Sequence, residues 1–239
     1  MKLAPSLPLV RALRKALKDR ADPVKAPAMQ AYMKSEMPYR GVQTPQRRQA
    51  AKGVFAAHPL DSFEAWRDTV LALWRGARYR EERYSAIDLI GYPKYRGFRN
   101  LESLPLYEEI IVSGAWWDYV DAIATQQLGE ALRHHPAAMA PLLREWAVSE
   151  NLWKRRAAIL AQLSFRGDTD RKLLYDCIRP SLGSAEFFLR KGIGWALREY
   201  AKTDPQEVIR FVRRQEGQLS ALTKREALRH VEPYSSSVR

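Results

Sequence analysis

The sequence lacks the features on which exported and membrane proteins depend. Its 239 residues include a single cysteine, Cys177, so no disulfide can form within the chain, and a cytoplasmic location is expected. Arg11, Arg14 and Lys15 interrupt the N-terminal apolar run before it reaches the length of a signal-peptide core. No later stretch approaches the roughly 18 apolar residues of a membrane span. We therefore expect neither export nor membrane insertion.

Patterns for metal, nucleotide or acyl-hydrolase chemistry are also missing. The chain has four histidines, of which the adjacent His134 and His135 would project in different directions from a helix. Cys177 offers no paired metal ligand. No P-loop, dinucleotide fingerprint or GxSxG elbow occurs. We therefore expect no metal site and no cofactor.

Positive charge is present in excess. The 40 Lys and Arg residues outnumber the 27 Asp and Glu residues, which gives a formal net charge of +13. A basic domain attracts polyanions, most often nucleic acid, although an acidic membrane surface or an acidic protein gives the same signal. Since 46% of the residues are hydrophobic, the chain can bury a core without disulfides or metals. Nucleic-acid binding is favoured, and a basic surface that serves only solubility is the alternative.

Helix signals dominate the sequence. Thr44-Pro45 and Asp204-Pro205 each predict an N-cap followed by proline at the first helical position. The helical segments align on small anchor residues: Ala51, Ala86, Ala122, Ala158, Gly192 and Ala227, at spacings of 35, 36, 36, 34 and 35 residues. Ile or Leu follows the anchor in five of the six segments, and Lys52 is the exception. This pattern indicates close helix packing repeated along the chain.

Two helices per repeat of this length predict an all-α, HEAT-like solenoid. We predict a single domain over residues 1–232 and a frayed tail over 233–239. Such a stack curves, and the second helices usually line its concave surface, so a basic concave face is expected from the architecture. An irregular helical bundle with an accidental period is the alternative.

Four blocks of sequence resemble those of one protein family, in the same order and over nearly the whole chain. The blocks are YMKSEMPYRGVQTPQRR (32–48), SGAWWDYVD (113–121), ENLWKRRAAILAQL (150–163) and FFLRKGIGWALREYAKT (187–203). WWDxVD, WxxRAAIL and GWALREY together form a specific signature. It resembles the AlkD-like DNA alkylation-repair glycosylases, which are HEAT-repeat proteins. That family removes cationic N3- and N7-alkylated purines from DNA by hydrolysing the N-glycosidic bond.

The resemblance implies roles for individual residues. It assigns the catalytic aspartate to Asp121, active-site tryptophans to Trp117 and Trp195, and a DNA-contacting arginine to Arg156. The further candidates for DNA contact are Tyr32, Arg48 and Lys154. The implied protein is a monomeric, monofunctional glycosylase of base excision repair, with alkylated duplex DNA as its partner. In a bacterium it would associate with the nucleoid.

Helical geometry predicts where the first four of these side chains point. Trp117, Asp121, Arg156 and Trp195 lie at positions −5, −1, −2 and +3 from their anchors. At about 100° per residue, they fall near 220°, 260°, 160° and 300°, whereas the apolar position after the anchor lies near 100°. We therefore expect them to face away from the repeat core, on one surface.

Each residue also has an ordinary structural interpretation. Asp121 could be a solvated charge, and Trp117 could be a packing residue, because Trp153 occupies the same repeat position. The run Lys154 to Arg156 could be a solvated helix face, and Trp195 could belong to the core. For the whole protein, the alternatives are a HEAT-like scaffold that binds damaged or branched DNA without catalysis, and an adaptor for acidic proteins. Asp121 favours an enzyme, since a scaffold has no use for a carboxylate beside phosphates.

Overall fold

The structure is a computed structural model that describes residues 4–231, and every regular element in this range is a helix. The predicted all-α fold is confirmed. The chain divides between Leu106 and Tyr107 into two compact units. The single domain of residues 1–232 stays a prediction, and the tail 233–239 lies outside the described residues. No helix in the described range is long and apolar enough to cross a bilayer.

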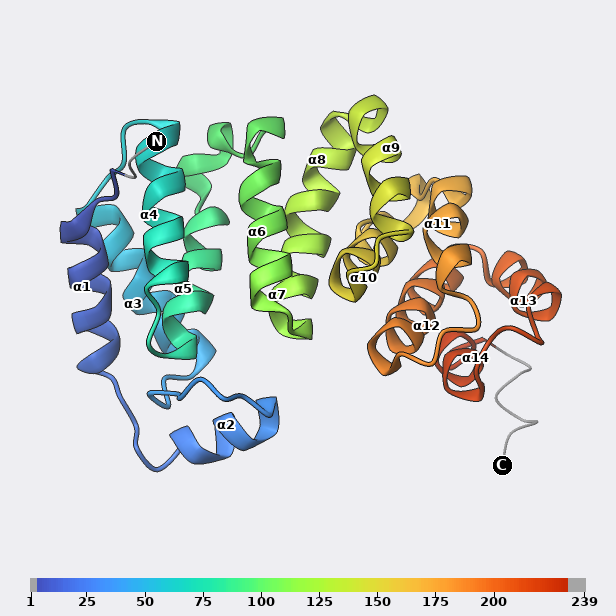
Figure 1. The fold of residues 1–239 in the computed structure, drawn as a ribbon, viewed down its shortest axis with the longest axis horizontal. Coiled ribbons are helices and arrows are strands. Elements are labelled where there is room, and N and C mark those ends of the chain that lie inside the picture. Colours follow the sequence, from blue (N-terminus) through green and yellow to red (C-terminus); the bar gives the residue numbers. More distant parts are fainter. Residues whose placement is uncertain (1–3, 232–239) are drawn as a thin grey trace. The chain divides into compact units, whose positions relative to one another are not determined.

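The first unit is built from five α-helices and two short 3₁₀ helices (Figure 1). They are α1 (Leu7–Lys18), α2 (Ala26–Met33), α3 (Thr44–Ala57), α4 (Phe63–Arg75), α5 (Arg80–Ile90), η1 (Pro93–Phe98) and η2 (Leu101–Ser103). α4 packs against α5, and α1 packs against both α3 and α4. The helix α6 (Leu104–Gly114) spans the boundary between the units.

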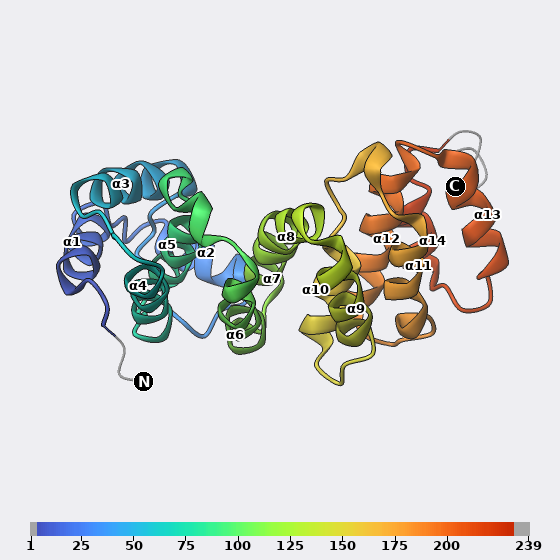
Figure 2. The same ribbon diagram turned by 90° about the horizontal axis from the view of Figure 1, so that it is seen from above.

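The second unit contains the remaining helices. They are α7 (Trp117–Ala122), the π-helical turn η3 (Ile123–Leu128), α8 (Gly129–His134), α9 (Pro136–Ala147), α10 (Leu152–Leu160), η4 (Arg166–Asp168), α11 (Arg171–Ile178), η5 (Arg179–Ser181), α12 (Phe187–Ala201), α13 (Pro205–Arg214) and α14 (Ala221–Ala227). α10 packs against α9 and α12, α11 packs against α9, and α12 packs against α14. Figures 1 and 2 show α10, α12 and α14 following one another in this unit.

The repeat inferred from the sequence corresponds to buried positions in both units. The apolar residues that follow the anchors are at most 8% exposed: Ile87, Ile123, Ile159, Ile193 and Leu228. Lys52, the one exception in the pattern, is exposed. The small anchors lie on α3, α5, α7, α10, α12 and α14, so consecutive anchors mark successive helix pairs. The period therefore reflects packing.

The two predicted helix starts differ in their outcome. Asp204 caps α13, because its carboxylate accepts a hydrogen bond from the Glu207 N–H at 2.9 Å. The prediction for α3 was wrong by one residue. Thr44 is already helical there, and Gln43 occupies the cap position in an extended conformation without a side-chain hydrogen bond.

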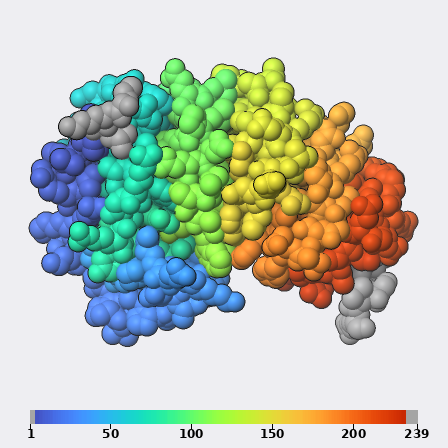
Figure 3. Space-filling view, in the orientation of Figure 1, coloured from blue at the N-terminus to red at the C-terminus, as the bar shows by residue number. Residues whose placement is uncertain are grey.

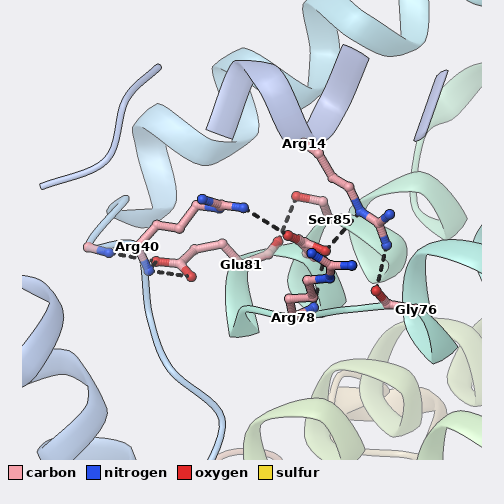
Figure 4. A network of polar contacts seen from close by, with 8 residues as sticks. Arg14, Arg40, Gly76, Arg78, Glu81 and Ser85 are labelled. Carbon is pink, nitrogen blue, oxygen red and sulfur yellow. Dashed lines mark hydrogen bonds and ion pairs between the residues drawn. The ribbon is translucent and has the colours of Figure 1, made fainter. Parts of the chain in front are cut away.

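A buried carboxylate fastens the loop between α2 and α3 to α5 (Figure 4). The fully buried Glu81 accepts hydrogen bonds from three successive backbone N–H groups, those of Arg40, Gly41 and Val42, at 2.9–3.1 Å. Gly41 has a φ of +83°, and a Cβ atom there would lie 2.0 Å from the Asp22 carbonyl oxygen. The loop therefore requires glycine at this position.

The neighbouring Glu82 ties the same loop to α1. Its fully buried carboxylate pairs with Arg14 at 3.1 Å and with Arg40 at 3.2 Å. It also accepts a hydrogen bond from the Arg78 N–H at 3.3 Å. Figure 4 shows Arg14 and Arg40 approaching α5 from different sides. Two adjacent acidic residues thus hold three segments of the unit together.

This network supports the segment that carries Tyr32. Figure 3 shows the segment around α2 projecting from the lower edge of its unit. Tyr32 lies on α2 and is 78% exposed, so its aromatic ring contributes little to the packing of the protein core. The loop that follows α2 is thus hydrogen-bonded to α5 within ten residues of Tyr32.

We predict that Glu81→Gln lowers the free energy of unfolding by about 3 kcal/mol. The neutral amide removes the charge that strengthens the three buried hydrogen bonds to Oε1, and it replaces Oε2, which also accepts from the Arg40 N–H, with an NH₂ group that cannot accept. Urea denaturation with an unchanged m value measures the effect. The control is Glu36→Gln, an exposed position that should change stability by less than about 0.5 kcal/mol. Equal stability of the two variants would contradict the role of Glu81.

Candidate functional site

Asp121 and Arg156 form a bidentate ion pair between α7 and α10. The Nε atom of Arg156 donates to Oδ1 of Asp121 at 2.7 Å, and Nη2 donates to Oδ2 at 2.8 Å. The side chains are 13% and 5% exposed. The remaining nitrogen, Nη1, donates to the carbonyl oxygen of Phe188 on α12. One guanidinium therefore links three helices, and α10 lies between the other two in Figure 1.

Gly192 leaves room for this arginine. It lies on α12, one turn after Phe188, and a Cβ atom there would lie 3.1 Å from Nη1 of Arg156. That separation is tighter than ordinary van der Waals contact, so a larger residue would press on the guanidinium. The small anchor residue Gly192 thus leaves space for Arg156, which belongs to the preceding repeat.

The backbone around α7 is unusual on both sides of the helix. Ala115 adopts a φ of +44°, which is uncommon for a residue with a side chain, in the tight turn from α6. The π-helical turn η3 follows directly after α7, and Thr125 Oγ1 donates to the Asp121 carbonyl oxygen at 2.7 Å. Left-handed alanines and π turns are concentrated at functional sites.

Burial dominates the electrostatics of Asp121. It raises the pKa of the Asp121 carboxyl above its usual range, and the hydrogen bonds and charge of Arg156 oppose this rise. Asp118 raises the pKa slightly further. The carboxylate therefore depends on its arginine to stay ionised.

The two candidate tryptophans flank the ion pair in their helices. Trp117 is the first residue of α7, four residues before Asp121, so both lie on one face of the helix. Trp195 is three residues after Gly192, on the side of α12 that meets Arg156. Both rings are partly exposed. Their role in the active site stays a prediction.

An aromatic cluster beside the pair was missed by the sequence analysis. Trp116 lies 6.2 Å from Trp153 and 5.3 Å from Phe188, measured between ring centroids. Trp153 is only 7% exposed, which makes it a packing residue. The indole nitrogen of Trp116 is buried without a hydrogen-bond partner. Trp116 and Trp117 are adjacent in the WWD motif, and adjacent side chains point in different directions. The motif could therefore have indicated that only one of the two rings packs inside the protein.

The candidates for DNA contact differ in accessibility. Arg156 was expected on an exposed surface, and this expectation is wrong. Its side chain faces the neighbouring helices, and all three of its side-chain nitrogens donate hydrogen bonds within the protein. Lys154 is 16% exposed, pairs with Glu108 at 2.7 Å and lies over the Trp146 ring.

Two further candidates belong to the first unit. Arg48 is 65% exposed and lies 3.6 Å from Asp88, and Tyr32 is the most accessible of the candidates. Of the sequence candidates, the structure therefore brings Asp121 and Arg156 into direct contact. Among residues 4–231, no group of three or more His, Cys, Asp or Glu side chains is arranged to hold a metal ion.

Comparison with known proteins agrees with this fold. A solved structure described as a predicted DNA alkylation repair enzyme from Enterococcus faecalis is 30% identical, with a TM-score of 0.79, and the match covers 90% of this chain and 98% of that one. AlkD2 from Streptococcus mutans shares the fold at 16% identity and a TM-score of 0.63, over 94% and 99% of the two chains. No curated protein matches the sequence significantly.

The family model described as DNA alkylation repair enzyme matches residues 13–231, which include all the helices from α2 to α14. The matched region contains the Asp121–Arg156 pair and the tryptophans beside it. The chain therefore belongs to the family of DNA alkylation repair enzymes.

Proposed function

We propose that this protein is a monofunctional DNA glycosylase. It hydrolyses the N-glycosidic bond of cationic N3- and N7-alkylated purines, such as 3-methyladenine and 7-methylguanine, in duplex DNA, and so begins base excision repair. The observation that carries the proposal is the buried carboxylate of Asp121, held by Arg156 between helices that also bear Trp117 and Trp195.

The chemistry requires one carboxylate. An alkylated purine already carries positive charge, so it departs as a neutral base without protonation by a general acid. The sugar develops oxocarbenium character as the bond stretches. A carboxylate against the sugar lowers this barrier electrostatically and orients the attacking water, as in glycoside hydrolysis. Asp121 supplies that group.

Arg156 acts on Asp121 as a positioning residue in this proposal. A bidentate guanidinium fixes the plane of a carboxylate, and its charge favours the ionised form. Because Arg156 is buried, a direct bond to a DNA phosphate would require it to leave Asp121 or Phe188. This role replaces the phosphate contact expected from the sequence.

The remaining candidates would contact the substrate. A cation over a tryptophan face is stabilised by about 0.5 to 2 kcal/mol, so Trp117 and Trp195 would favour a cationic base or sugar. Tyr32 and Arg48 are exposed enough to contact duplex DNA, and Lys154 would exchange Glu108 for a phosphate. We propose that the protein acts as a monomer, in the cytoplasm or at the nucleoid.

A second candidate function is binding of damaged DNA without catalysis. It is favoured by the ion pair itself, since Arg156 already neutralises much of the charge that Asp121 would offer to the sugar. The two functions differ in whether the Asp121 charge is needed for base release.

We predict that Asp121→Asn lowers the single-turnover rate of 7-methylguanine release by about 100-fold or more, because it removes the charge that stabilises the sugar. Binding to duplex DNA with a stable abasic-site mimic should persist. Asp61→Asn, at an exposed position, is the control and should react at the wild-type rate.

The Asp121 variant leaves a buried arginine unpaired, which costs stability. The double variant Asp121→Asn, Arg156→Gln removes both charges and should recover thermal stability without recovering base release. Wild-type release by Asp121→Asn would favour the binding function.

We predict that Arg156→Gln moves the acid limb of the pH–rate profile to higher pH. Arg156 opposes the rise of the Asp121 pKa that burial causes. Without Arg156 the pKa rises further, so the carboxyl ionises only at a higher pH. The profile is measured in single turnover with 7-methylguanine DNA. Arg155→Gln removes the same charge one residue earlier and should leave the limb in place; an identical profile for both variants would contradict the role.

We predict that Gly192→Ala slows base release about 10-fold without unfolding the protein, because the added methyl group displaces the guanidinium that orients Asp121. The effect should shrink in an Arg156→Lys background, where no Nη1 atom meets the methyl group. Gly53→Ala on α3, where a Cβ atom would meet nothing within 4 Å, is the matched control. It should keep the wild-type rate and gain up to about 1 kcal/mol of stability. Full activity of Gly192→Ala in the wild-type background would show that the close approach is unimportant.

A further inference from the structure

A second cluster of charges lies on α12 and α14. Glu226 on α14 pairs with two cations of α12, with Lys191 at 2.8 Å and with Arg198. The side chains of Lys191, Arg198 and Glu226 are 38%, 18% and 12% exposed. These residues, together with Arg225 and Arg229, are called the Glu226 cluster below.

Positive charge in this cluster exceeds what the carboxylate can balance. Arg225 precedes Glu226 on α14, Arg229 lies in the turn that follows this helix, and both are exposed. Neither has an ion-pair partner within residues 4–231. Arg198 reaches one further carboxylate, Glu199, at 3.9 Å. Like charges gathered around a single carboxylate repel each other, so the arrangement costs folding free energy unless an anion binds.

Lys191 connects the cluster to the candidate active site. Its pKa is lowered by burial and, in addition, by the charges of Arg198, Arg229, Arg225 and Arg156. These four arginines therefore lie close enough to Lys191 to act on it. Lys191 also precedes Gly192, the residue that contacts Arg156. The excess positive charge thus borders the Asp121–Arg156 pair.

The two helices that carry the cluster are held closely together. A Cβ atom on Gly194 would lie 2.7 Å from the Cβ atom of Glu226. Thr223 Oγ1 donates to the Arg190 carbonyl oxygen at 3.2 Å. Figures 1 and 2 both show α12 and α14 side by side. The helices that carry Lys191, Arg198 and Arg225 therefore hold these charges in place before binding, which lowers the ordering cost of binding.

We propose that the Glu226 cluster binds the DNA phosphate backbone beside the reacting nucleotide, with Arg225 and Arg229 as the phosphate contacts. The identification of DNA as the anion rests on the proposed function. The negative phosphodiester backbone of DNA offsets the repulsion among the cations. Contacts to its phosphates fix the register of the duplex without recognising its sequence. A solvated surface without a partner would not require this local surplus of positive charge.

The test compares two double variants with the same net charge. Arg225→Gln, Arg229→Gln changes the cluster, whereas Arg11→Gln, Arg213→Gln removes two exposed arginines elsewhere that have no ion-pair partner among the described residues. Affinity for duplex DNA with an abasic-site mimic is measured over a range of salt concentrations. The cluster variant should flatten the plot of log affinity against log salt by about two units, and the control should not.

Two further measurements relate the loss of binding to base release and to folding. With enzyme well below saturation, the cluster variant should release 7-methylguanine more slowly in single turnover than the Arg11→Gln, Arg213→Gln control, in proportion to its weaker binding. Without DNA and at low salt, its melting temperature should rise, because two repelling charges are gone, while that of the control stays unchanged.

Equal salt slopes for the two double variants would overturn the proposed surface. Equally strong binding of polyglutamate and DNA of the same charge would overturn the assignment to DNA. If the wild-type protein binds duplex with the expected slope but releases no alkylated base, the glycosylase proposal fails and the phosphate-binding surface stands.

Discussion

The buried pair of Asp121 and Arg156 is the interaction on which the second unit's functional geometry depends. Burying two charges is costly, and well-packed apolar side chains of similar size often stabilise a protein more. The pair therefore contributes little to stability that a hydrophobic contact could not supply. Its specific effect is orientation, since the same guanidinium fixes the carboxylate on α7 and the backbone of α12.

The two units hold buried carboxylates in different ways. Glu81 is bound by three backbone N–H groups, which cannot rotate away without moving the loop. Asp121 is bound by a side chain, which can change rotamer while the helices stay in place. The first arrangement suits a permanent structural joint. The second holds the carboxylate through a side chain that is itself fixed at a third helix by the Phe188 carbonyl oxygen.

The sequence predicted the parts of this structure that follow from periodicity. Ile123 and Ile159 are buried because every repeat presents the same position to its neighbours, and this is visible as a spacing. Arg156 could not be placed in this way, because helical angle alone does not distinguish a solvent face from the face of the next helix. The partners of Glu81 lie about 40 residues away and follow no period, so this joint required the structure. The resemblance to a known family drew attention to Asp121 as a candidate catalytic residue. The structure added its ion pair with Arg156, which favours the ionised carboxylate.

The π-helical turn after α7 has a consequence for the helix faces on either side of it. A π turn takes up one more residue than an α turn between the same two ends. It does not set the length of the repeat, because the interval from Ala86 to Ala122 is 36 residues without a π turn, the same as the interval from Ala122 to Ala158 that contains η3. Its effect is local. The turn begins two residues after Asp121, so the face of α8 that packs against α9 is offset by one residue from the pattern that an uninterrupted α-helix would continue from Asp121.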